Sequence, residues 1–172
     1  DVQELPTHGG SLRVFAQRVD TGSRPASPAV AAMLDRETAV GVSREDYYTG
    51  FQLNTNRIKD DFLGFLLDAK RQGKSVAAYG AAAKGNTLMN YAGIRPDFVS
   101  FVVDKNPAKQ GKFMPGSRIP ITGEGRLHQA KPDYIVILPW NLKDEIINQL
   151  SYTREWGCKA VVAVPRLSVH SF

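Results

Sequence analysis

The chain has 172 residues and a formal net charge of +5, from 22 basic and 17 acidic residues. Hydrophobic residues make up 42% and charged residues 23% of the sequence, which is typical of one well-packed globular domain with some additional elements. No apolar run approaches the roughly 20 residues that cross a bilayer, and no signal peptide is evident. We therefore expect a cytoplasmic protein without a membrane partner.

The basic residues are spread along the chain and form no dense block with interleaved aromatic residues, which argues against nucleic acid as a partner. Several of them fall in or near the loops predicted to follow strands: Lys84, Lys105, Lys109, Lys112 and Arg118. This clustering favours a small anionic ligand, with solvated surface lysines as the alternative. The single cysteine, Cys158, precedes an apolar run and is predicted to be a small buried hydrophobe.

The first 72 residues contain three predicted elements and a linker. Ser11–Val19 is expected to form a strand, and residues 20–28 a linker rich in small and turn-forming residues. Pro28–Val40 is predicted to be a short helix that begins with proline. Ser43–Gln72 is predicted to be one long helix, because its apolar residues recur every three or four positions.

From residue 74 onward, short apolar runs alternate with helical patterns. The predicted strands are 75–79, 98–103, 133–138 and 159–164, and the predicted helices are 86–92, 124–130 and 142–155, with a long loop over 105–122. Continuous apolar strands are expected where helices cover both faces of a sheet. The alternation predicts an α/β fold with a Rossmann-like, doubly wound and mainly parallel sheet.

The loop after the first of these strands is a candidate phosphate site, because a turn from strand to helix aims backbone N–H groups at one point. It reads as G-x-A-x-x-G at Gly80, Ala82 and Gly85, and Asp104 lies near the spacing at which an acid holds a ribose hydroxyl. Ala82 replaces the second glycine of this motif, and its methyl group leaves a pyrophosphate less room to approach the backbone. Close packing of strand and helix through small residues is the alternative interpretation.

Further candidates follow the later strands, because ligands of open parallel sheets bind beyond the carboxyl ends of the strands. They are Asp104, Asn106, Lys109 and Gln110 after the second strand, and Trp140 and Asn141 after the third. Trp140 is equally suited to stacking on a ligand and to anchoring the core. The histidines lie far apart in the sequence and only one cysteine is present, so we expect no metal site.

Four segments resemble, in the same order, the C-terminal domain of S-adenosylmethionine-dependent C-methyltransferases that act on nucleotide-linked deoxysugars: 80–87, 103–111, 114–121 and 138–145. The similarity covers about Ser43 to Pro165. Residues 8–13, HGGSLR, resemble the end of that family's methyltransferase domain. The resemblance implies that residues 1–28 are the tail of a preceding methyltransferase domain plus a linker. Residues 29–172 would then form the Rossmann-like C-terminal domain.

The resemblance also implies a binding site for a nucleotide-linked sugar, with Lys84 neutralising phosphate charge. Its expected residues are Gly80, Ala81, Ala82, Lys84, Gly85, Asn86, Thr87, Asp104, Asn106, Lys109, Gln110, Trp140 and Asn141, and His8 is implied to be catalytic in the intact enzyme. The parent enzyme would use S-adenosylmethionine, whereas this chain alone is expected to bind no cofactor and to be inactive. The preceding methyltransferase domain would be its partner in the same chain. A module that binds NAD(P) and a non-catalytic interaction domain are the alternatives.

Overall fold

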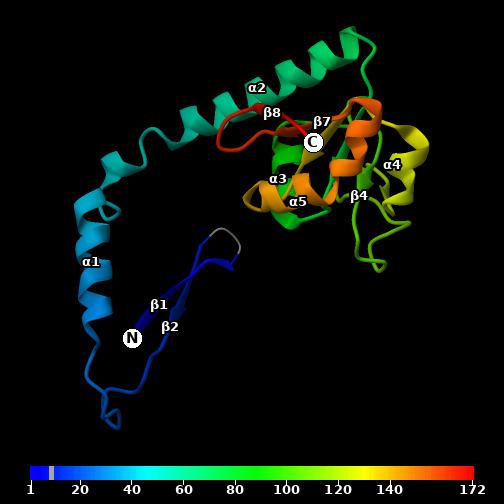
Figure 1. Ribbon diagram of the computed structural model, residues 1–172. Coiled ribbons are helices and arrows are strands. Elements are labelled where there is room, and N and C mark those ends of the chain that lie inside the picture. The colour runs from blue at the N-terminus through cyan, green and yellow to red at the C-terminus, as the bar shows by residue number, and fades with distance from the viewer. Residues whose placement is uncertain (8–9) are drawn as a thin grey trace. The chain divides into compact units, whose positions relative to one another are not determined.

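The computed structural model describes residues 1–7 and 10–172, and it divides the chain into two compact units, residues 1–54 and 55–172 (Figure 1). The helix α2 (Phe51–Arg71) crosses this boundary. The boundary lies beyond the one predicted between residues 28 and 29.

The first unit contains a β-hairpin and two helical segments. Strand β1 (Val2–Leu5) pairs antiparallel with β2 (Ser11–Val14), and α1 (Pro28–Val40) and the 3₁₀ helix η2 (Glu45–Tyr47) follow. The strand predicted over 11–19 therefore ends early, and its partner β1 was not predicted. The long helix predicted from Ser43 begins only at Phe51, because Thr49 and Gly50 are poor helix formers.

The second unit is built on a six-stranded sheet in the order β5-β4-β3-β6-β7-β8. Its strands are β3 (Val76–Tyr79), β4 (Val102–Val103), β5 (Ile121–Thr122), β6 (Tyr134–Ile137), β7 (Lys159–Val162) and β8 (Ser168–Ser171). All neighbours pair in parallel except β7 and β8. This arrangement confirms the predicted Rossmann-like, mainly parallel sheet. The short strands β5 and β8 are additions that the sequence pattern did not predict.

Helices cover both faces of this sheet, as the apolar strands require. Helices α2 and α3 (Ala83–Tyr91) pack against the face that carries Ala78 and Val136. Helices α4 (Gly125–Ala130) and α5 (Lys143–Gln149), with the 3₁₀ helix η4 (Ser151–Trp156), pack against the face that carries Ala77 and Ile137. No helix in the described ranges is both long and apolar enough to span a membrane.

Two predicted helices have different bounds in the structure. Helix α3 begins at Ala83, three residues earlier than predicted, so Lys84 and Gly85 belong to its first turn. The helix predicted over 142–155 is two pieces, α5 and η4, which meet at Leu150. The 3₁₀ helix η3 (Trp140–Leu142) precedes α5.

Candidate functional site

Two glycines set the geometry of the turn from β3 into α3. Gly80 has a φ of +88°, and a Cβ there would overlap the ring of Pro139. A Cβ at Gly85 would lie 2.5 Å from the Cβ of Leu138, which no real side chain tolerates. Both positions thus require glycine, because α3 begins in close contact with the residues that follow β6. The glycines serve close packing, which was one of the two interpretations of this loop.

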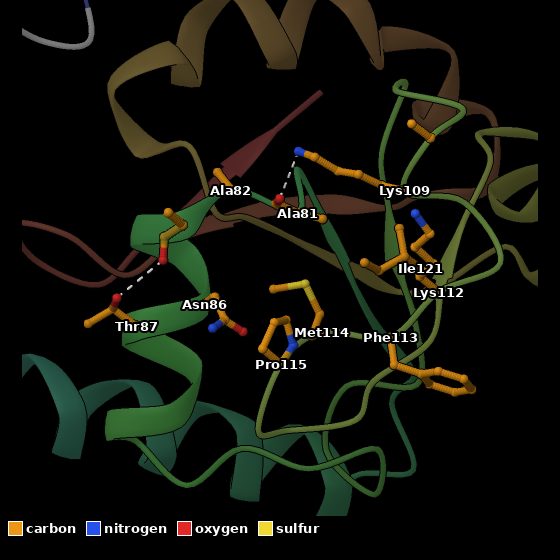
Figure 2. A pocket seen from close by; sticks show the side chains of 12 residues that line it. Ala81, Ala82, Asn86, Thr87, Lys109, Lys112, Phe113, Met114, Pro115 and Ile121 are labelled. Carbon is orange, nitrogen blue, oxygen red and sulfur yellow. Dashed lines mark hydrogen bonds between the residues drawn. The ribbon is translucent and has the colours of Figure 1, made fainter.

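A cavity of about 500 Å³ opens beside this turn, between α3 and the segment that joins β4 to β5 (Figure 2). The residues that line it are Ala81, Ala82, Ala83, Asn86, Thr87, Ala108, Lys109, Lys112, Phe113, Met114, Pro115 and Ile121. It lies beyond the carboxyl ends of β3 and β4, where ligands of such sheets bind. Apart from two lysines and two polar side chains of α3, Asn86 and Thr87, its lining side chains are apolar.

Asp104 connects the loop after β4 to the turn after β3. One carboxylate oxygen accepts hydrogen bonds from the backbone N–H of Ala81 at 2.8 Å and from Lys109 Nζ at 3.1 Å, and the other accepts the N–H of Asn106 at 2.8 Å. The residue is only 9% exposed. Asp104 therefore fastens the end of β4 to the turn after β3, and most of its acceptor capacity is used within the protein.

Lys109 and Gln110 complete this connection. Lys109 Nζ also donates to the carbonyl oxygen of Ala81 at 2.9 Å, as Figure 2 shows, and Gln110 donates its side-chain amide to the carbonyl oxygen of Asp104 at 2.9 Å. Asn106 accepts the N–H of Ala108 at 2.9 Å, which closes a local turn. Of these side chains only Lys109 reaches the cavity wall.

Lys84, Trp140 and Asn141 form a separate cluster outside the cavity lining. Lys84 Nζ donates a hydrogen bond to Asn141 Oδ1 and lies 5.0 Å from the centre of the Trp140 ring. Trp140 also packs against the core on the face of the sheet covered by α4 and α5. The lysine predicted to neutralise phosphate thus has protein partners where α3 meets η3.

The predicted site residues therefore fall into two groups. Five of them line the cavity: Ala81, Ala82, Asn86, Thr87 and Lys109. The others shape the turn, fasten the loops or lie beside η3: Gly80, Lys84, Gly85, Asp104, Asn106, Gln110, Trp140 and Asn141. His8 lies outside the described residues.

Seven lining residues were not among the predicted contacts: Ala83, Ala108, Lys112, Phe113, Met114, Pro115 and Ile121. The segment that carries most of them is ordered by pairing between its two arms. The N–H of Met114 donates to Ile119 at 2.8 Å, and that of Ile121 donates to Lys112 at 2.8 Å. Two sequence signals pointed to this segment, the positive charge of Lys112 and the family resemblance over residues 114–121, but neither indicated that its side chains face α3.

The charge of the cavity is positive. Its lysines and the N-terminal turn of α3 all favour an anion, and no carboxylate is among the lining residues. Tyr79, on the opposite face of the sheet, has its pKa raised by burial and is not an acid–base group near neutral pH. No group of three potential metal ligands occurs among the described residues. This arrangement is chemically suited to an anionic, partly apolar ligand.

The structure is a Rossmann-like domain with a cavity at the carboxyl end of its sheet. A family model described as the C-methyltransferase C-terminal domain matches residues 6–165. C-methyltransferase NovU from Streptomyces niveus is 36% identical over 171 residues, which are 99% of this chain and 40% of that protein. The chain therefore belongs to the C-methyltransferase C-terminal domain family, which confirms the resemblance found in the sequence. It spans less than half the length of this relative.

Proposed function

We propose that the chain is the nucleotide-sugar-binding domain of an S-adenosylmethionine-dependent C-methyltransferase, whose substrate is a nucleotide-linked keto-deoxysugar. The cavity of about 500 Å³ beside the start of α3 is the observation that carries this proposal. Phosphate groups would lie near Lys109, Lys112 and the first N–H groups of α3. The apolar wall formed by Met114 and neighbouring residues would contact the neutral part of the ligand.

We assign the methyl donor to the preceding methyltransferase domain, as the family resemblance implies. The acid that holds a ribose in many Rossmann-like sites is here Asp104, whose oxygens are engaged by Ala81, Asn106 and Lys109. We therefore expect a nucleotide bound by this chain to be held without that contact. Methylation beside a keto group needs a base that removes a carbon-bound proton and a donor that stabilises the enolate. The resemblance implies that His8 takes part in catalysis in the intact enzyme, and we assign no residue of this chain as that base.

The N-terminal segment supports the existence of such a partner domain. Helix α1 contains no buried residue, and the hairpin side chain of Val14 is 70% exposed. A two-stranded hairpin is marginally stable in water on its own. We propose that residues 1–28 are the end of a methyltransferase domain plus a linker, and that this domain covers their apolar side chains.

Isothermal titration calorimetry of the 172-residue chain with a nucleoside-diphosphate sugar and with S-adenosylmethionine tests the proposal. We expect weak binding of the nucleotide sugar and no heat with the methyl donor. Tight binding of S-adenosylmethionine would refute the assignment. Enhanced nicotinamide fluorescence on mixing with NADH would instead favour a dinucleotide-binding module. A chain that binds no nucleotide, yet restores activity to the added upstream domains, would be an interaction domain.

A further inference from the structure

Asn90, the penultimate residue of α3, joins the two walls of the cavity. Its Nδ2 group donates to the carbonyl oxygen of Asn86 at 3.1 Å and to that of Pro115 at 2.9 Å. Asn86 and Pro115 both line the cavity, one from α3 and the other from the segment that joins β4 to β5 (Figure 2). Because an amide NH₂ group has two hydrogens, this one side chain connects both walls.

The next residue of that segment fits closely against the same amide. Gly116 has a φ of +80°, and a Cβ there would overlap Asn90 Oδ1. Only glycine therefore allows the turn to adopt this conformation and to approach the Asn90 side chain. Asn90 thus holds the turn through a hydrogen bond on one residue and close contact with the next.

The segment is fastened to the α3 region at two places. Lys109 Nζ donates to the carbonyl oxygen of Ala81 just before α3 begins, and Asn90 holds Pro115 near the other end of the helix. Seven residues separate the first residue of α3 from Asn90, which corresponds to about 10 Å at 1.5 Å per residue. The first connection lies at the proposed phosphate position, so a diphosphate there would direct its nucleoside toward the second.

The base of the turn is held independently of Asn90. Met114 and Ile119 are fully buried in the core that also contains residues of α3. Pro115 and Gly116, between them, are exposed. Loss of the Asn90 amide would therefore release the tip of the turn and leave the fold intact.

We propose that Asn90 is a positioning residue that fixes Pro115 against α3 and thereby sets the width of the cavity at its nucleoside end. This inference rests on the proposed nucleotide site and adds the group that shapes it. Asn90 is not among the lining residues, so it acts through Pro115. A wall that is already in place loses less conformational freedom when the nucleoside binds, which strengthens binding. The phosphate end does not depend on Asn90, because Lys109 is held by Ala81 and Asp104.

Replacing Asn90 by alanine tests this role, because it removes both hydrogen bonds and adds no charge. The 172-residue chain is titrated with inorganic pyrophosphate and with the diphosphates of thymidine, uridine, guanosine and adenosine. We expect Asn90→Ala to weaken binding of the tightest-binding nucleotide roughly 3- to 10-fold, the effect of one neutral hydrogen bond, and to leave pyrophosphate affinity unchanged. A residue with a structural role alone would lower the melting temperature without separating the two ligands.

Asn148→Ala is the matched control. Asn148 is the penultimate residue of α5 and is likewise exposed, but its helix packs against the opposite face of the sheet. The variant makes the same change of helix propensity as Asn90→Ala. It is expected to leave the affinities for nucleotide and for pyrophosphate as they are in the parent chain.

Gly116→Ala disturbs the same contact from the other side, since its Cβ would displace the Asn90 amide. Alone it should weaken nucleotide binding as Asn90→Ala does, and the double variant should bind no more weakly than either single variant. Unchanged nucleotide affinity in Asn90→Ala, an equal loss for pyrophosphate, or additive losses in the double variant would each overturn the inference and leave the nucleotide site standing. If the parent chain binds none of the four nucleotides, the proposed function fails and the inference with it.

Discussion

Replacing Asp104 by alanine tests whether this carboxylate fastens the loops or holds a ligand. The substitution removes the acceptor of two backbone N–H groups, those of Ala81 and Asn106, and the partner of Lys109. Hydrogen bonds to a charged group contribute about 1.5–3 kcal/mol each. Asn106 is exposed, so in the variant its N–H group can bond to water and little stability is lost there. The ion pair with Lys109, whose side chain is 40% exposed, contributes little to the free energy of unfolding.

The loss of these hydrogen bonds is expected to lower the free energy of unfolding by about 2–4 kcal/mol. The corresponding fall in melting temperature is roughly 5–15 °C for a domain of this size. Tryptophan fluorescence is a suitable signal, because both tryptophans, Trp140 and Trp156, lie in the unit formed by residues 55–172. Unfolding of the variant in guanidinium chloride and by heat gives the two values directly.

Asp144→Ala is the control, because the Asp144 side chain is 88% exposed and its ion pair with Lys143 spans 3.6 Å. It should lower the melting temperature by roughly 2 °C or less, because exposed substitutions usually change stability by no more than about 0.5 kcal/mol. If Asp104→Ala unfolds like the parent chain but loses affinity for a dinucleotide, Asp104 is a ligand residue. The loop-fastening role would then be refuted.

Three further predictions concern charge and protonation. Lys112→Ala should weaken binding of a nucleoside-diphosphate sugar roughly tenfold, which is the loss expected for one charge-assisted hydrogen bond. The same titration with Lys84→Ala decides whether Lys84 also contacts phosphate. Hydrogen bonds from Lys74 and Ser75 hold the pKa of Asp133 at about 2, below its ordinary 3.8. Urea unfolding should therefore show stability falling as the pH drops from about 4 to 2, and less so in Asp133→Asn, because the unfolded chain binds the proton first. Burial raises the pKa of Cys158 to about 12, so a thiol reagent at pH 8 should react only after denaturation.

The sequence predicted the central strands well, because their apolar runs are long enough to be distinctive. Strands β3, β6 and β7 each have four residues, of which at least three are buried. Strand β5 has only two residues, and β8 alternates half-buried and exposed positions with two serines and a histidine. A two-residue strand carries no periodicity, and a polar edge strand resembles a loop, so neither was predicted.

The candidate site was predicted on the side of α3 but not on the side of the opposite loop. Asn86 and Thr87 follow directly from the strand–turn–helix pattern. Pro115 and Met114 depend on how residues 105–121 fold, which is determined by the bridge between Phe113 and Pro120 and by other pairings within that segment. The position of Asp104 was also predicted, but its role depends on the contact with Lys109, which the spacing of a motif does not reveal.

The two halves of the sheet explain why we propose a mononucleotide rather than a dinucleotide as the ligand of this domain. A dinucleotide extends across the switch point of a doubly wound sheet, here between β3 and β6. That point is filled, because the ring of Pro139 occupies the space beside Gly80 and Lys84 bonds to Asn141. The half formed by β3, β4 and β5, in contrast, retains an open cavity. A nucleotide bound there, as proposed, would extend its sugar away from the closed half.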